Sequence, residues 1–349
     1  LWEEQLAGIS PAGIPGTSSN VPAARAPEVA TAIVEAIGES QSQKSQSQTF
    51  AVSKTILHVV EPPGRIRRIA TAVLINDGLE MVEEDGEEIE SVWMPDGHRK
   101  TLCISTQSGC RLGCTFCLTG TLGLLRNLTS AEIVGQFMAV NEDLEETDRV
   151  TNVVLMGMGE PLDNYEAVVD AVRLMISPEG LRISTRKVTL STAGMVDKIK
   201  MFKNENLPVN LAISLNATED KTRNMIMPIN KKYPIKVLLE SLRDYPLKPN
   251  RRFTFEYVLL GGINDTDEDA VRLANLLKNI PSKINLIPFN SYNDAGYRPP
   301  SEERVKQFQN YLMSKSFNVF IRKNRGADIL GACGQLAGRK GAASSQIKL

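Results

Sequence analysis

Four of the five cysteines of this 349-residue chain fall between positions 103 and 117, and three of them, Cys110, Cys114 and Cys117, have the spacing C-x3-C-x2-C. Three thiolates on one compact loop can hold three corners of a cubane iron–sulfur cluster and leave the fourth iron open to another ligand. The alternative is a structural zinc ion with Cys103 as the fourth ligand. We favour the cluster, because zinc ligands usually come as two close pairs and Cys103 lies on a predicted strand, seven residues ahead of Cys110.

The fifth cysteine, Cys333, stands alone near the C-terminal end. A lone intracellular cysteine is more often a buried apolar thiol than a reactive one. Here Gly331 and Gly334 flank it, which is typical of a flexible loop and favours a functional role. An odd number of cysteines without a secretory signal fits a reducing compartment, where cysteines bind metals or take part in catalysis.

Composition restricts the class of protein. Hydrophobic residues make up 42% and charged residues 23% of the chain, as in a soluble globular protein. The net charge of -1 excludes a uniformly basic nucleic-acid coat, and an aromatic content of 5% argues against a base-stacking surface. We see no apolar run long enough to span a membrane. The chain begins with Leu, so we expect a fragment or a processed form, and a targeting peptide could have preceded it.

Three segments differ in organisation. Residues 1–50 are rich in small residues, Pro and Gly and contain the polar tract SQSQKSQSQ, so we expect them to be mostly disordered. Residues 51–100 contain three β-branched runs, ILHVV, IATAVLI and IESVWM, which predict a small antiparallel sheet. Residues 101–340 alternate short apolar strands with amphipathic helices, which predicts a mainly parallel sheet with right-handed crossovers. Six such units predict an α/β fold and favour a barrel or a partial barrel over a sandwich.

The expected elements of residues 101–340 follow from these patterns. The strands are expected at 102–105, 153–156, 187–190, 209–215, 253–259, 284–287 and 319–321. The helices are expected at 130–142, 164–175, 196–203, 234–245, 267–278 and 301–314.

Polar and glycine residues follow several of these strands. In a barrel, residues at the carboxyl ends of the strands point into the ligand site. Each could instead cap a helix or form a tight turn, which is the commoner role of an isolated Ser, Asn or Gly. The candidates for such a ligand site are Gly159, Glu160, Ser191, Ser214, Leu215, Asn216 and Asn290.

The cysteine loop at the end of the first strand resembles the radical S-adenosylmethionine (SAM) superfamily. The surrounding motifs, in order, resemble more specifically the RlmN-type adenosine C2 methyltransferases of ribosomal and transfer RNA and their C8-methylating relative Cfr. These motifs are TLCISTQSGCRLGCTFC, RNLTSAEIVGQ, GMGEPLDNY, KVTLSTAG, LAISLNA, MPINKKYPI, LIPFN and RGADILGACGQLAG. The resemblance spans roughly residues 70–340.

The resemblance implies a radical SAM partial (β/α)6 barrel with a [4Fe-4S] cluster on Cys110, Cys114 and Cys117. It implies that the chain uses two molecules of SAM in each turnover and an electron donor such as flavodoxin or ferredoxin. The substrate would be 23S rRNA, with tRNA left open as a second substrate. The protein would be a cytoplasmic monomer, or an organellar one if a targeting peptide is missing. The residues that match the SAM-binding positions of the family are Gly159, Glu160, Ser191, Ser214, Leu215, Asn216 and Asn290.

The chemistry explains why such an enzyme needs two further cysteines. The sulfonium methyl of SAM is an electrophile, and the electron-poor C2 and C8 of adenine do not attack it, so a radical route is needed. A cysteine thiolate can accept the methyl group first. By resemblance Cys333 carries the methyl group, Cys103 resolves the protein–RNA bond by forming a disulfide, and Glu90 accepts a proton. Taken alone, Glu90 is one more acid in the acidic run EEDGEEIE.

Contacts to RNA must come from local basic clusters, because the net charge supplies no general attraction. Of the candidates, the cluster near Cys333 is favoured by its position; each of the others could be a solvated face. The clusters are Arg65, Arg67 and Arg68; Lys231 and Lys232; Arg251 and Arg252; and Arg322, Lys323 and Arg325.

Three rival functions remain open at this point. They are a C8-methylating enzyme, a different radical SAM enzyme, and a non-catalytic zinc-bound RNA-binding module. Relatives usually carry an N-terminal helical accessory domain that helps to grip RNA, and the first fifty residues here do not resemble it.

Overall fold

The computed structural model describes residues 57–61, 65–75, 78–80, 88–292, 295–322 and 334–336. The chain divides into two compact units, Leu1–Ala51 and Val52–Leu349. All of the first unit lies outside the described residues, so the expected disorder of residues 1–50 and the proposed domain boundaries stay predictions. No helix among the described residues is long and apolar enough to cross a membrane.

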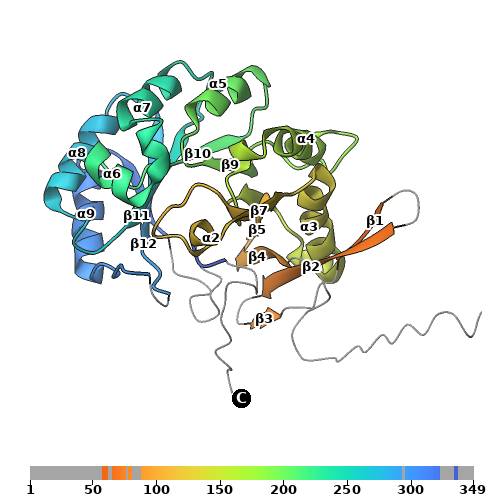
Figure 1. Ribbon diagram of the computed structural model, residues 1–349. Coiled ribbons are helices and arrows are strands. Elements are labelled where there is room, and N and C mark those ends of the chain that lie inside the picture. The colour runs from red at the N-terminus through yellow and green to blue at the C-terminus, as the bar shows by residue number, and fades with distance from the viewer. Residues whose placement is uncertain are drawn as a thin grey trace, which may run out of the picture. The chain divides into compact units, whose positions relative to one another are not determined.

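An 11-stranded sheet forms the framework of the second unit, with the strand order β1-β2-β4-β5-β8-β9-β10-β11-β12-β13 and β3 paired to β2 (Figure 1). From β5 onward every neighbouring pair is parallel. These seven strands are β5 (Arg99–Ile104), β8 (Asn152–Leu155), β9 (Val188–Thr192), β10 (Asn210–Ser214), β11 (Phe253–Leu259), β12 (Ser282–Pro288) and β13 (Asn318–Ile321). At least one helix lies between each strand and the next in the chain, which confirms the α/β partial barrel.

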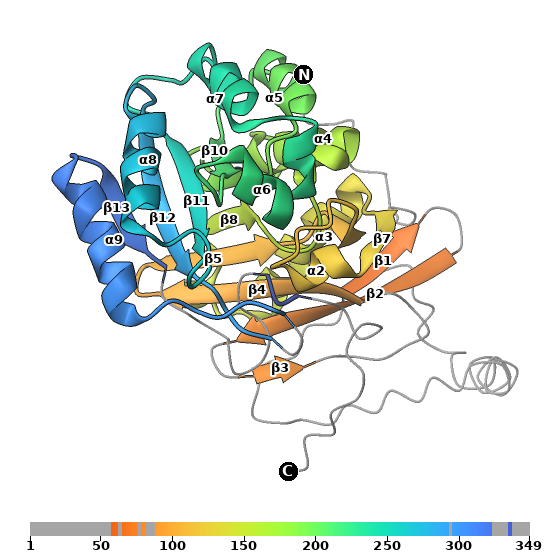
Figure 2. The ribbon, with the colours of Figure 1, turned by 60° about the vertical axis from the view of Figure 1, so that its left-hand side comes forward.

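The connecting helices lie where the apolar periodicity places them, within a few residues. Two of them, α3 (Ser130–Asp143) and α8 (Asp267–Leu277), begin with capping boxes in which Thr129 and Thr266 pair with the third helical residue. The short helices α2 (Leu118–Thr121) and α6 (Asp220–Ile226) were not predicted, because so few residues show no apolar period. The others are α4 (Tyr165–Ile176), α5 (Val196–Asn204), α7 (Ile235–Arg243) and α9 (Glu302–Ser314). Figure 2 shows α8 and α9 beside β11, β12 and β13.

Alternation along the strands separates the core from the interior of the barrel. In β11, for example, Phe253, Phe255 and Tyr257 are fully buried in the main hydrophobic core together with side chains of the helices. Their neighbours Glu256 and Val258 point to the opposite face and line a cavity. Burial of each such aromatic or aliphatic side chain contributes about 1.5–3 kcal/mol. One face of each strand therefore holds the helices, and the other is available for chemistry.

The segment before β5 differs from the antiparallel sheet expected for residues 51–100. Antiparallel pairing is confirmed for β1 (Leu57–Glu61) with β2 (Arg65–Ile75), for β3 (Gly78–Glu80) with β2, and for β4 (Glu88–Asp96) with β5. However, β2 and β4 are parallel. The reason is that β3 runs back along β2, so that the chain reverses again before it enters β4. Through β4 the extension is continuous with the main sheet.

Candidate functional site

The cysteine loop is held by a two-stranded sheet, β6 (Gln107–Cys110) with β7 (Gly123–Asn127). Gly109 makes this hairpin possible, because its φ is +76° and a Cβ there would lie 2.0 Å from the carbonyl oxygen of Gly123. The amide of Thr115 donates to the carbonyl of Ile226 at 3.0 Å, which ties the loop to α6. The loop thus has a defined position at the end of β6.

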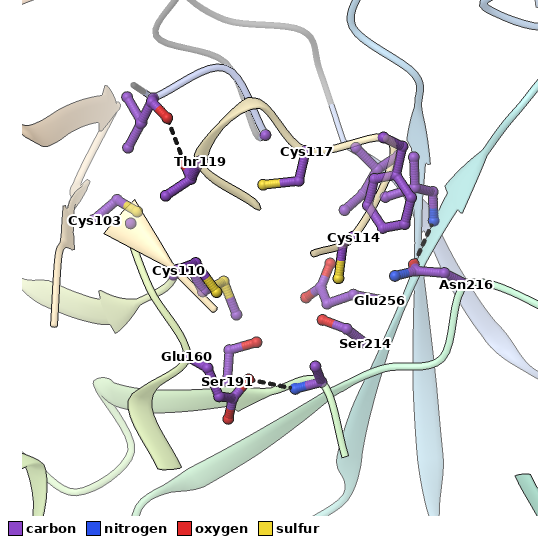
Figure 3. Close-up of a pocket in the computed structure, with 18 of the residues that line it drawn as sticks. Cys103, Cys110, Cys114, Cys117, Thr119, Glu160, Ser191, Ser214, Asn216 and Glu256 are labelled. Carbon is purple, nitrogen blue, oxygen red and sulfur yellow. Dashed lines mark hydrogen bonds between the residues drawn. The ribbon is translucent and has the colours of Figure 1, made fainter. Parts of the chain in front are cut away.

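Cys110, Cys114 and Cys117 line one cavity of about 200 Å³. Figure 3 shows their sulfur atoms turned toward a common space. Burial raises the pKa of Cys110 to about 12 and also raises the pKa of Cys114 and Cys117. Repulsion between neighbouring thiolates adds to the rise at Cys110 and Cys114. Without a cation the thiols therefore stay protonated at neutral pH, and binding of a metal would release protons.

This donor set fits an iron–sulfur cluster. The donors are three soft thiols from one loop, and an apolar group that includes Phe116, Val258 and Phe289 packs around the loop. Among the described residues, no three His, Cys, Asp or Glu side chains are placed to hold a single metal ion.

Cys103 lies on β5 at another part of the cavity wall and is buried. Its side chain packs in a small cluster with Val92, Val154, Met158 and Leu336. Figure 3 shows it beyond Cys110, away from Cys114 and Cys117. It faces the cavity from the strand, as the alternation of β5 requires.

Six of the seven candidate ligand residues line the same cavity. They come from the inner faces or the ends of β8, β9, β10 and β12, and they are Gly159, Glu160, Ser191, Ser214, Asn216 and Asn290. Gly159 needs to be glycine, because its φ is +96° and a Cβ would lie 2.5 Å from Cβ of Gln107. Asn216 has a φ of +55°, and its side-chain oxygen accepts a hydrogen bond from the amide of Val258 at 2.9 Å.

Glu160 is a buried acid at the base of this wall, with 4% of its surface exposed. Its carboxylate accepts hydrogen bonds from the amides of Ala193 at 2.7 Å and Leu162 at 3.2 Å. Burial raises the pKa of Glu160 to about 7, although these hydrogen bonds lower it. A cationic ligand in the cavity would favour the ionised carboxylate.

Three sequence candidates are not placed at the cavity. The side chain of Leu215 lies on the opposite side from that of Ser214 and is fully buried in the main core. Glu90 is buried on β4 and is not among the cavity-lining residues; its carbonyl accepts a hydrogen bond from Ser105 Oγ at 2.6 Å. Cys333 lies outside the described residues, whereas Gly334 and Leu336 after it line the cavity.

Glu256 is a cavity residue that the sequence argument missed. It lies directly opposite Ser214 on β10 and Asn285 on β12 in the strand register, and Asn285 Nδ2 donates to its Oε1 at 2.8 Å. Its Oε2 is buried and accepts no hydrogen bond from the described residues. Burial raises its pKa. A single acid at an inward position of the apolar run FTFEYVL was the signal that could have identified it.

The chain is similar in sequence and in fold to several known proteins. The family model of the Radical SAM superfamily matches residues 104–274. Two relatives with the name dual-specificity RNA methyltransferase RlmN come from Pelobacter propionicus and Geobacter sulfurreducens. The first is 52% identical over 74% of this chain and 74% of its own, and the second is 53% identical over 73% and 70%. A crystal structure of a radical SAM methyltransferase from Sphaerobacter thermophilus is 40% identical, covers 81% of each chain and superposes with a TM-score of 0.70.

A second family model, described as flagellar M-ring protein C-terminal, matches residues 3–94. This is about a quarter of the chain, and most of it lies outside the described residues.

Proposed function

This chain belongs to the RlmN family of dual-specificity RNA methyltransferases, and from that premise we propose that it methylates C2 of an adenosine in 23S rRNA and in tRNA. One observation carries the proposal: three loop thiols, a polar strand face and Cys103 all open into a single cavity. A cluster held by three thiolates has one iron without a protein ligand, and this iron is useful only if another ligand can reach it. The cavity provides the space for such a ligand.

The radical SAM family implies both a [4Fe-4S] cluster and SAM. In our proposal Cys110, Cys114 and Cys117 hold the cluster, and SAM lies against Gly159, Glu160, Ser191, Ser214, Asn216 and Asn290. When bound, the cluster supplies the electron that cleaves SAM to a 5′-deoxyadenosyl radical. Glu160 pairs with the ammonium of the methionine moiety, since it is an acid held on this wall by two amides.

Cys333 and Cys103 perform the transfer in this proposal. The Cys333 thiolate takes a methyl group from one SAM, and this methyl group then loses a hydrogen atom to the radical derived from a second SAM. The methylene radical adds to C2 of adenine, and the adduct would then give one electron back to the cluster and the ring proton to Glu90. The Cys103 thiolate attacks the sulfur of Cys333 and forms a disulfide. The carbon–sulfur bond breaks with its electron pair on the methylene carbon, which takes a proton to become the methyl group. An external donor such as flavodoxin or ferredoxin must supply the electrons that reduce the cluster and the disulfide.

The described basic residues differ in their availability for RNA. Arg251 donates to Thr185 Oγ1 at 3.2 Å and to the carbonyl of Pro208 at 3.3 Å. Its guanidinium is therefore occupied by hydrogen bonds within the protein. Arg322 lines the cavity. We therefore propose that the cluster that begins at Arg322 guides the RNA toward the reaction site.

The test of this function is the identity of the product. RNA treated with the anaerobically purified full chain, SAM and a reductant is digested, and the modified nucleoside is compared with synthetic 2-methyladenosine and 8-methyladenosine. We expect 2-methyladenosine from both 23S rRNA and tRNA. The 8-methyl product would support the Cfr-like alternative. A colourless, zinc-containing protein with no modified nucleoside would support the RNA-binding module.

Replacement of Glu160 tests the SAM site separately from the cluster. Glu160→Gln should keep its iron but lose about tenfold or more in SAM affinity, because a charged hydrogen bond is lost. The parent should also bind SAM more weakly as the pH falls through about 7, where the carboxylate becomes protonated. Equilibrium dialysis across this pH range measures both effects. A parent and a Gln variant with the same affinity and the same pH profile would remove Glu160 from the pocket.

A further inference from the structure

Arg223 on α6 is a fully buried cation, with 0% of its surface exposed. Its guanidinium donates to the carbonyls of Leu215 at 2.9 Å, Ala193 at 2.7 Å and Ser214 at 3.0 Å. It also donates to Asn230 Oδ1 at 2.9 Å. All of these acceptors are neutral, so the hydrogen bonds are satisfied while the positive charge is not compensated.

No carboxylate among the described residues forms an ion pair with Arg223. Asp220 is the acid whose charge raises the pKa of Arg223. Its carboxylate, however, accepts hydrogen bonds from Asn230 Nδ2 and the amide of Ile235, each at 2.9 Å. Burial lowers the pKa of Arg223 to about 10, so the side chain stays charged at neutral pH. A buried charge with no partner costs several kcal/mol, and natural proteins normally compensate it.

Arg223 lies behind the wall of the cavity that the cysteine loop lines. Ala193 and Ser214, whose carbonyls accept hydrogen bonds from its guanidinium, line this cavity together with Cys114. On the same helix as Arg223, the carbonyl of Ile226 accepts a hydrogen bond from the amide of Thr115, the residue after Cys114. The helix α6 therefore carries Arg223 and also holds the cysteine loop. A cluster bound to three thiolates and its sulfides is anionic, because these charges exceed those of the irons.

We propose that Arg223 is the counter-ion of the iron–sulfur cluster, a positioning residue that raises the reduction potential of the bound cluster. This rests on the proposed function, since it needs a cluster on Cys110, Cys114 and Cys117. Reduction adds one negative charge to the cluster, and a buried positive charge nearby stabilises the reduced form more than the oxidised form. The carbonyl contacts of Arg223 keep that charge in place at the ends of β9 and β10.

The experiment is a potentiometric titration of the reconstituted full-length chain, followed by electron paramagnetic resonance in the absence of SAM. Arg223→Gln removes the charge and should move the midpoint potential to a more negative value. Arg223→Lys keeps the charge and should restore most of the parent potential, although it cannot make all four hydrogen bonds. Arg272→Gln is the control, because Arg272 already has Asp269 as a partner at 2.6 Å and should leave the potential unchanged.

A second variant covers the case in which Arg223→Gln does not fold. The double variant Asp220→Asn with Asn230→Asp exchanges the two side chains, so a carboxylate accepts from the guanidinium without facing a second carboxylate, and it should also make the potential more negative. An unchanged potential in Arg223→Gln, or in the double variant where the first variant does not fold, would overturn this inference while leaving the proposed function intact. A parent chain that assembles no cluster would instead overturn the proposed function.

Discussion

Cys103→Ala should accumulate a covalent protein–RNA species that migrates slowly on a denaturing gel and disappears on treatment with RNase. By the proposed mechanism, Cys333 should still be methylated in this variant and its methylene carbon should still add to adenine. The bond between them then persists, because its release needs a second thiolate to attack the Cys333 sulfur. Cys103 is suited to this role by position, since it is buried at the cavity wall and packs against Leu336, close in sequence to Cys333.

Cys333→Ala is the matched control for that experiment. Without the Cys333 thiol no methyl group is stored, so neither an adduct nor a methylated product should form. Both variants should keep the iron content of the parent, because neither cysteine is assigned to the cluster. Loss of iron in Cys103→Ala alone would instead support a metal site in which Cys103 is the fourth cysteine ligand. Absence of the adduct from both variants would leave the methyl-carrier mechanism without support.

Cys114→Ala should abolish cluster assembly and, with it, all reductive cleavage of SAM. Two thiolates cannot hold a cubane that needs three corners fixed by the protein. The measurements are iron and acid-labile sulfide after anaerobic reconstitution, and 5′-deoxyadenosine after reduction. Cys103→Ala serves as a cysteine control that should retain both signals. Production of 5′-deoxyadenosine by Cys114→Ala at the parent rate would contradict the assignment.

Much of the barrel could be predicted because its signals are local. The helices α3 and α8 have apolar periods and begin at residues that can form capping boxes, and the strands are short apolar runs between them. The hairpin of β6 and β7 was not predicted, because it depends on how Gly109 approaches Gly123 across the cysteine loop. The parallel pairing of β2 with β4 was likewise missed, since strand direction depends on the reversal at β3.

The candidate site shows the same division. Ser214, Leu215 and Asn216 are consecutive in one motif, yet Ser214 and Asn216 line the cavity and Leu215 lies in the core. Ser214 ends β10, and the backbone of the two residues after it, with Asn216 at a φ of +55°, decides this, whereas the sequence motif does not mark which side chains turn inward. The single acid in the apolar run FTFEYVL was a local signal for Glu256, and the strand register places this residue opposite Ser214.

The sequence by itself determined the donors of this protein: three thiols spaced for a cluster, two further cysteines, and a series of strands and helices. These are properties of residue type and spacing along the chain, which do not depend on distant contacts. The tertiary structure decided which of these residues share a cavity, and it brought Glu256 into the cavity wall and Arg223 behind that wall. The physical reason is that one wall is built from several parallel strands, so its composition depends on register and on which face of each strand turns inward.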